Sequence, residues 1–248
     1  MILQSLSKAI REQNYYAVLL EFVIVIAGVV IGFQIQAWNA ARAASEAEQI
    51  YLARLHEDMR LSVCRIAEER ELLVEWNDRA RKTLRALLAA DPSAVDDTGF
   101  ELIASTRIQV GTPHRATLNE LVGGGQMNLI TSPELRAIIA TVDAELTALG
   151  GYIQLLSSVQ GNFSENIHRR LRPTADRIYE ITYDFEVLAG DETFINSLGQ
   201  ALRVTRTNAM WLERMIEAAD RLRIALAEAL GRDPAARPDC SSNKASDS

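Results

Sequence analysis

Residues 15–38 read YYAVLLEFVIVIAGVVIGFQIQAW, one long apolar run near the N-terminus. Its first 19 residues, up to Phe33, include a single charged residue, Glu21. A helix rises about 1.5 Å per residue, so this part extends roughly 28 Å, close to the thickness of the hydrocarbon core of a bilayer. The run therefore predicts one membrane-spanning helix near the N-terminus, with membrane lipid as its surroundings.

Aromatic residues flank the run where interfacial anchors are expected, with Tyr15 and Tyr16 before it and Trp38 after it. Two other interpretations stay open. A buried core helix is usually shorter, about 10–14 residues, and keeps polar positions, whereas residues 22–33 are apolar on all sides. A cleaved signal peptide has an apolar region of about 7–15 residues, and residues 41–43 (Ala-Arg-Ala) only weakly resemble a cleavage site.

The charges around the run indicate its orientation. Lys8 and Arg11 precede it, whereas Arg42 is followed closely by Glu46 and Glu48. Because positive residues favour the cytoplasmic side, we expect a cytoplasmic N-terminus and a large C-terminal part outside. In a bacterium this describes a single-pass protein of the inner membrane with a periplasmic domain.

The composition predicts one folded, helical domain beside the anchor. The 248 residues are 48% hydrophobic and 24% charged, with only 6 Pro and 13 Gly. The net charge of −7 disfavours nucleic acid, which binds basic surfaces. Cys64 and Cys240 are the only cysteines and form no metal-binding motif. They could pair in an oxidising compartment or remain two free thiols.

The sequence predicts an all-α fold in which the transmembrane helix is continuous with a long helix of an antiparallel extramembrane helical bundle. We expect four parts, which are a short amphipathic segment (1–14), a transmembrane helix (15–38), a helical bundle domain (39–230) and a disordered tail (231–248).

Two stretches carry apolar residues at alternating steps of three and four. Along residues 43–90 eight of eleven such positions are apolar, and along residues 191–230 nine of eleven, so each predicts a long helix that packs on others. Two long helices would then frame two or three shorter ones. The polar interruptions are Ser62, Glu69 and Thr83 in the first stretch and Thr205 and Arg223 in the second.

The middle of the chain holds several start and stop signals. Asp91-Pro92-Ser93 ends the first long helix, and Ser132-Pro133-Glu134 starts another, which we expect to break at Gly150-Gly151 and to resume until residue 171. Residues 100–104 predict a short helix. Thr117 is the expected cap of a helix over 118–122, and residues 173–190 are helical or extended.

The chain resembles a bacterial single-pass membrane family of unknown function, closely over residues 21–58 and weakly over most of its length. EFVIVIAGVVIGFQIQAWNAAR followed by YLARLHEDM is similar to that family's opening, E-I-x-L-V-x-x-G-x-x-I-A-x-Q-I-x-x-W-N followed by Y-L-x-x-L-x-x-D-L. Gly32-Phe33 and Ala37 depart from the pattern. The resemblance implies an anchor followed by a helical domain, and it implies no activity. The matching residues are Glu21, Gly28, Gln34, Ile35, Trp38, Asn39, Tyr51, Leu52, Leu55 and Asp58.

One face of the predicted transmembrane helix suits association with another helix. Glu21, Gly28, Gly32 and Gln36 follow one another at helical spacing. The two glycines allow a close approach, and Glu21 and Gln36 can form hydrogen bonds across the contact. We expect this face to support a homodimer or contact with a partner.

Signals for chemistry are weak elsewhere. Arg107, His114 and Arg115 form a candidate anion pocket beside Gly123-Gly124-Gly125, a loop that more simply connects two helices. The three histidines share no ligand spacing, and no catalytic order of Ser, His and Asp occurs. We therefore expect no enzyme, no cofactor and no metal.

Two functions remain. The first is a structural or protein-interaction module at the cell envelope, with an unidentified envelope protein as partner. The alternative is an extracytoplasmic bundle of the sensory type that binds a small ligand. Since about 14 residues precede the predicted span, such a sensor would signal through a partner protein.

Overall fold

The computed structural model describes residues 15–95, 99–174 and 181–240, and the side chains from residue 19 onward. The predicted amphipathic segment (1–14), residues 96–98, the side chains of the expected anchors Tyr15 and Tyr16, and residues 241–248 of the predicted tail lie outside the described parts. The chain divides into two units, residues 1–49 and 50–248, which are described separately.

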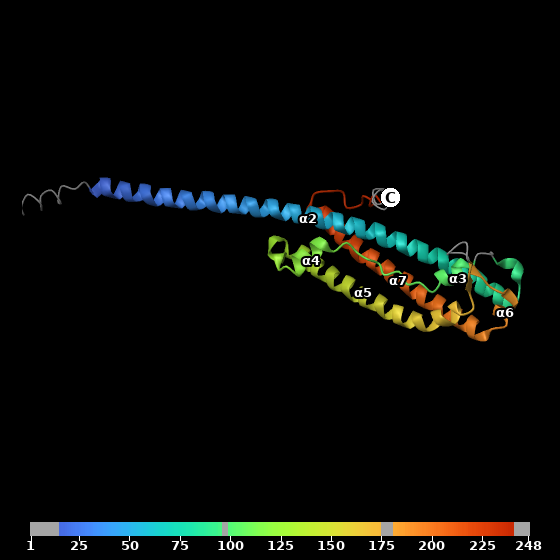
Figure 1. Cartoon of the computed structure of the whole chain (residues 1–248). Coiled ribbons are helices and arrows are strands. Elements are labelled where there is room, and N and C mark those ends of the chain that lie inside the picture. The colour runs from blue at the N-terminus through green and yellow to red at the C-terminus, as the bar shows by residue number, and fades with distance from the viewer. Residues whose placement is uncertain (1–14, 96–98, 175–180, 241–248) are drawn as a thin grey trace, which may run out of the picture. The chain divides into compact units, whose positions relative to one another are not determined.

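The described residues are almost entirely helical (Figure 1). Two 3-10 turns and one antiparallel pair of two-residue strands complete the fold. The elements are α2 (Tyr15–Ala89), η1 (Pro92–Ala94), α3 (Phe100–Ala104), α4 (Ala116–Val122), η2 (Gln126–Leu129), α5 (Pro133–His168), β1 (Arg172–Pro173), β2 (Ile181–Thr182), α6 (Phe185–Ala189) and α7 (Glu192–Ala229).

The first unit consists of the apolar part of α2. Among the described residues this is the one helix long and apolar enough to span a membrane, and none of its most apolar window is buried. Large side chains such as Phe22, Phe33 and Trp38 are more than half exposed. This helix is therefore not buried within the described part of the chain, and its exposed apolar surface suggests a membrane anchor.

The second unit is built on three long helices, which are α2 from Ile50 onward, α5 and α7. Contacts between Arg70 and Glu213 and between Asn77 and Thr205 show that α7 runs antiparallel to α2. Contacts between α5 and α7, from Glu145 to Arg221 and from Asn166 to Ser197, show the same relation there. It follows that α2 and α5 run parallel to each other (Figure 1). The predicted antiparallel helical bundle is therefore confirmed in outline, but three long helices build it where two were expected, because α5 is 36 residues long.

The core lies along the seams predicted from the spacing of apolar residues. One cluster joins all three long helices to α4 and is centred on Leu55, Leu146 and Leu212. A second cluster lies at the other end of the bundle, around Phe194, Leu198 and Leu102. Ala80 and Ala201, which belong to this second cluster, are small enough to let helices approach closely.

Several predicted helix boundaries are confirmed. Ser132 accepts a hydrogen bond from Leu135 N–H at 3.1 Å and Pro133 opens α5, as its sequence indicates. Asp191 caps α7 through the N–H groups of Thr193 and Phe194. Asp91-Pro92-Ser93 follows the end of α2 and forms η1. The α3 helix spans the five residues expected of it.

Residues 173–190 contain both kinds of structure that were considered. β2 pairs with β1, with Thr182 opposite Arg172, and Asp184 then caps the short helix α6 by accepting from Val187 N–H at 3.2 Å. Residues 175–180 lie outside the described parts.

The predicted break at Gly150-Gly151 is wrong, because α5 continues through both glycines. Each glycine lowers helix propensity by about 1 kcal/mol relative to Ala, but Leu146, Leu149 and Ile153 on the same helix are buried in the core. Burying these three side chains outweighs the cost of the two glycines.

We expect Gly150→Ala to stabilise the bundle by about 0.5–1 kcal/mol. A Cβ at this position would meet no other atom within 4 Å. The matched control is Gly111→Ala, where φ is +62° and a Cβ would lie 2.5 Å from Leu212 Cδ2. That variant should lose stability. Denaturant unfolding of the full chain in detergent measures both, and destabilisation by Gly150→Ala would contradict the prediction.

Candidate functional site

An extended segment, residues 105–115, returns along the bundle from α3 to α4, and we call it the crossover segment (Figure 1). It allows α2 and α5 to run parallel, since the chain must come back before α5 starts. Its residues from Arg107 onward belong to neither helix nor strand. Their backbone N–H and C=O groups therefore need partners from elsewhere in the fold.

Side chains of all three long helices supply these partners. Asn208 of α7 accepts from Gln109 N–H and donates to its carbonyl oxygen, both at 2.9 Å. Glu69 of α2 accepts from Gly111 N–H at 2.9 Å, and Gln160 of α5 donates to Ser105 O at 2.9 Å. The crossover segment is therefore bound by side chains of all three long helices.

Side chains of α2 also accept hydrogen bonds from backbone N–H groups at the start of α4. Ser62 Oγ accepts from His114 N–H at 2.8 Å, and Asp58 Oδ2 accepts from Thr117 N–H at 2.9 Å. Thr117 is therefore not the cap, as its position in the sequence indicated, because it lies inside α4. The capping carboxylate comes from α2, 59 residues earlier in the chain.

The polar residues that interrupt the two predicted apolar series therefore have a structural role. Besides Ser62 and Glu69, Thr83 donates to Glu101 of α3 at 3.0 Å, and Thr205 donates to Asn77 at 2.7 Å. These side chains are buried or half-buried and already satisfied. They are not free to serve a ligand.

The three residues of the predicted anion pocket have different partners. Arg107 lies over the ring of Trp76, 6.0 Å from its centroid. Arg115 forms an ion pair with Asp143 of α5 and donates to Thr147 at 2.9 Å. The described contact of His114 is made by its backbone. The structure therefore places each of them against a different neighbour, and the pocket stays a prediction.

The predicted association face of the apolar helix is open. Glu21, Gly28, Gly32 and Gln36 are all exposed on α2. A Cβ at either glycine would meet no other atom within 4 Å, so nothing within the described chain requires a glycine there. The face therefore remains free for a second helix.

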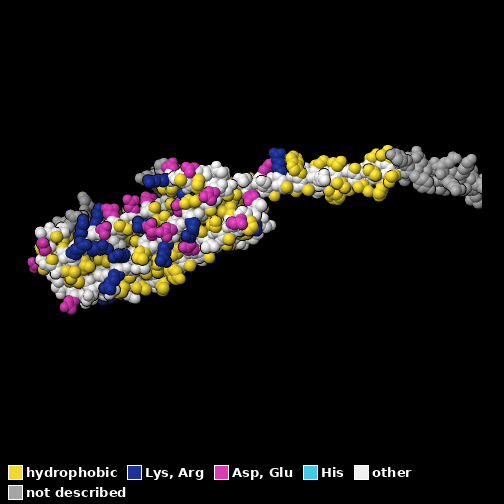
Figure 2. All heavy atoms as spheres, turned by 180° about the vertical axis from the view of Figure 1, so that it is seen from behind, with side chains coloured by type: hydrophobic (Ala, Val, Ile, Leu, Met, Phe, Trp, Pro, Cys, Tyr) yellow, Lys and Arg dark blue, Asp and Glu magenta, His cyan; other side chains and the backbone are white. Residues whose placement is uncertain are grey.

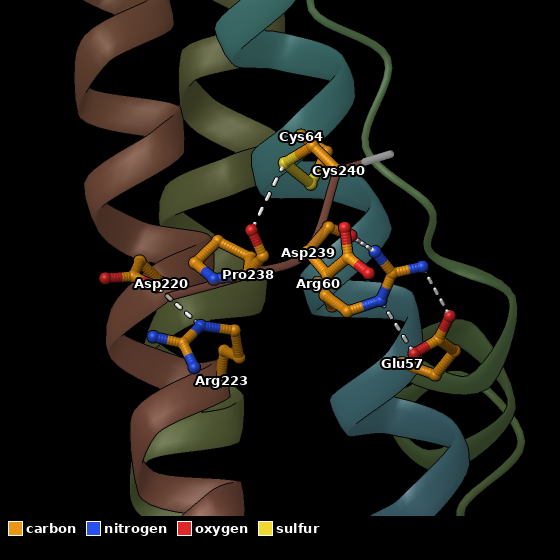
Figure 3. Close-up of a disulfide and its surroundings, with 8 residues drawn as sticks. All are labelled: Glu57, Arg60, Cys64, Asp220, Arg223, Pro238, Asp239 and Cys240. Atoms are coloured by element: carbon orange, nitrogen blue, oxygen red, sulfur yellow. Dashed lines mark hydrogen bonds and ion pairs between the residues drawn. A yellow bond between two sulfur atoms is a disulfide. The ribbon is translucent and has the colours of Figure 1, made fainter. Parts of the chain in front are cut away.

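The segment after α7 differs from the predicted disordered tail. Residues 231–240 cross from the end of α7 to α2, where Cys240 forms a disulfide with Cys64 (Figure 3). Arg60 donates to Asp239 O, and the buried Arg223 donates to Ala236 O at 3.1 Å. Arg223, the remaining polar interruption of the second seam, thus fastens this segment. Composition favoured disorder here, but one covalent bond and these hydrogen bonds outweigh it.

The disulfide bears on the cellular location of the second unit. Disulfides persist in oxidising compartments and are rare in the cytoplasm. Of the alternatives left open for Cys64 and Cys240, the structure shows the paired one. The bond favours an extracytoplasmic position for the bundle.

A histidine lies where the C-terminal segment begins. Arg232 Nη1 lies 3.3 Å from His56 Nδ1, and arginine can only donate in this contact, so His56 must be neutral. Burial, together with the charge of Arg232, lowers the pKa of His56 below its usual value of 6.5.

We expect acidification from pH 7 towards pH 5 to weaken this contact. Because the folded pKa is lowered, His56 contributes stability above pH 6.5 that is lost as the pH falls through the folded value. At pH 7 wild type should therefore melt at a higher temperature than His56→Asn. In thermal unfolding of the full chain, this difference in melting temperature should become smaller on acidification. A constant gap would contradict the assignment.

An open groove of about 510 Å³ lies between α2 and α7. Its lining is mostly charged, and Arg70 pairs there with Glu213 and Arg81 with Asp78. Across residues 15–95, 99–174 and 181–240, no cluster of His, Cys, Asp or Glu is arranged to hold a metal ion.

Comparisons with protein-family models, with curated proteins and with solved structures found no match for this chain. The resemblance of residues 21–58 to a membrane family therefore stays a prediction.

Proposed function

We propose that this protein is a single-pass bacterial inner-membrane protein whose helical bundle acts in the periplasm as a structural or protein-interaction module. The observation that carries the proposal is the combination of an exposed apolar helix with the Cys64–Cys240 disulfide. The first supports anchoring in a bilayer, and the second supports an oxidising compartment on the bundle's side. The positive charges before the span support a cytoplasmic N-terminus.

The use of the buried polar side chains supports interaction over catalysis. Asn208, Glu69 and Gln160, which could otherwise furnish a reactive site, hold the crossover segment. What the bundle offers to other molecules is therefore its surface. We propose as partners the membrane lipid, a protein of the envelope and a second copy meeting it through the Gly28–Gly32 face, with no nucleic acid and no cofactor.

The groove between α2 and α7 favours a second candidate, a sensory-type bundle that binds a small anionic ligand. Arg206 and Arg214 line this groove, and both side chains are exposed. Millimolar citrate or inorganic phosphate should then raise the melting temperature of the full chain, and Arg206→Gln should abolish the rise. The absence of any shift with these anions would speak against this candidate.

Photo-crosslinking in living cells tests the main proposal. A photoreactive residue placed at exposed Leu72, Val187 or Met210 samples α2, α6 and α7 of the bundle. The expected result is a discrete adduct from at least one position, with an envelope protein identified by mass spectrometry. The same residue at buried Leu146 is the control and should give none. Adducts with cytoplasmic proteins alone, or none from any surface position, would contradict the proposal.

A further inference from the structure

The middle of α5 lacks charge over an unusual length. Residues 146–164, LTALGGYIQLLSSVQGNFS, contain no Asp, Glu, Lys or Arg. At the chain's average of 24% charged residues, a stretch of this length would hold four or five of them. Much of the stretch is nevertheless on the surface, so burial does not explain the absence of charge.

This helix has two seams on opposite sides. The inner seam packs in the bundle through Leu146, Leu149 and Ile153. A second series, displaced by two residues and therefore by about 200° around the helix, faces outward. All of its members are exposed, namely Ala148, Gly151, Leu155, Ser158 and Asn162. Its members, like those of the inner seam, are alternately three and four residues apart. This is the spacing of contact residues on helices that pack side by side.

Apolar side chains border the outer seam. Leu155 is 61% exposed, Tyr152 52% and Val159 38%. Tyr152 also lies against Trp211 of α7, with ring centroids 5.3 Å apart, which extends the apolar surface towards that helix. Figure 2 shows hydrophobic side chains along the lower edge of the bundle, where Figure 1 places α5. We call Ala148, Gly151, Tyr152, Leu155 and Val159 the outer α5 face.

The charge pattern indicates what covers this face. The whole chain carries a net charge of −7, so two copies that meet through charged surfaces repel each other. The outer α5 face contains no charged residue. Contact between two such faces therefore requires no desolvation of an ion, and identical residues can pack together without electrostatic repulsion. The face is therefore complementary to itself.

Anchoring in one membrane brings two copies together, and this step rests on the proposed function. A two-fold axis that passes through the outer α5 faces places like residues of the two copies opposite each other. Small residues such as Ala148 and Gly151 allow close approach, and Asn162 falls on the same series, where a polar residue can set the register of a helix pair. Confinement to the membrane also raises the effective concentration of the second copy.

We propose that a second copy of this chain docks on the outer α5 face, giving a two-fold symmetric dimer with Leu155 opposite Leu155. The contact lies in the bundle and is separate from the glycine face of the transmembrane helix. Since Leu155 is exposed within one copy, its replacement leaves the fold of the bundle intact.

Charge substitution in the full chain tests the dimer. Wild type and variants, labelled with donor or acceptor fluorophores, are reconstituted in lipid vesicles, and association is measured by energy transfer as the protein-to-lipid ratio varies. Leu155→Glu and Leu155→Lys should each weaken association at least tenfold, because like charges then face each other. An equal mixture of the two should restore it. Met210→Glu, an equally drastic change at an exposed α7 position, is the matched control and should have no effect.

The outcomes separate this inference from the proposed function. If Leu155→Glu associates like wild type, or if the mixture fails to recover, the outer α5 face is not the contact. Loss of association with Gly28→Ile but not with Leu155→Glu would place the contact in the span and overturn the inference. A chain that stays monomeric at every ratio would also overturn it, whereas the photo-adducts with an envelope protein would still support the proposed function.

Discussion

Replacing Asn208 by Leu should lower the free energy of unfolding by roughly 3 kcal/mol. Asn208 is fully buried, and its amide makes two hydrogen bonds to the backbone of Gln109. Leucine has a similar size but leaves both backbone groups of Gln109 without a partner, at a cost of about 1–3 kcal/mol for each group buried. The crossover segment would then lose its hydrogen bonds to Asn208 of α7.

Denaturant unfolding of the full chain in detergent, followed by circular dichroism, measures this loss. Met210→Ala is the control, since this exposed residue lies two positions along the same helix and should change stability by less than about 0.5 kcal/mol. If Asn208→Leu costs no more than the control, the crossover segment is not held by this side chain.

Replacing both Cys64 and Cys240 by serine should be the other large effect. The bond joins residues 176 positions apart and so encloses almost the whole bundle. Chain-entropy arguments give about 5 kcal/mol for a loop of that length, and measured disulfides usually contribute about 2–4 kcal/mol. We expect the double variant to lose stability within this range.

The same loss should appear in wild type on addition of a reductant, and the double variant should then be insensitive to it. Truncation after Cys240 keeps the bond and serves as the control, with an expected change below about 0.5 kcal/mol. Equal stability of wild type and double variant would mean that the bond does not constrain the unfolded chain in the way described.

Local signals in the sequence predicted much of the fold. Ser132 was recognised as a helix start because capping depends on residues only two or three positions away. The apolar run of α2 was recognised for a similar reason, since its length and composition alone match a bilayer. The spacing of apolar residues also located the core of the long helices.

Long-range contacts could not be predicted in the same way. Asp58 caps a helix that begins 58 residues later, and Asn208 binds a segment 99 residues earlier, so no local window contains both partners. Ser62 and Glu69 did stand out as polar residues in an apolar seam, which could have indicated a segment in need of hydrogen-bond partners. Gly150 wrongly indicated a helix break because its cost to the helix is local, whereas the packing that offsets this cost comes from α7 and α2.

The surfaces offered to partners were only partly accessible to sequence reasoning. The glycine face of the transmembrane helix was visible from spacing alone. The outer α5 face was not, since Leu155 and Ile153 look equivalent until the structure shows the first exposed and the second buried. The absence of charge over residues 146–164 is the signal that could have revealed it.

The location of the bundle is the central claim, and cysteine labelling tests it most directly. Met210→Cys places a thiol on the exposed surface of α7, while the native cysteines stay in their disulfide. Cells are treated, without reductant, with a maleimide that passes the outer membrane but not the inner one. We predict labelling in intact cells. Labelling only after the inner membrane is permeabilised would place the bundle in the cytoplasm and contradict the proposed function.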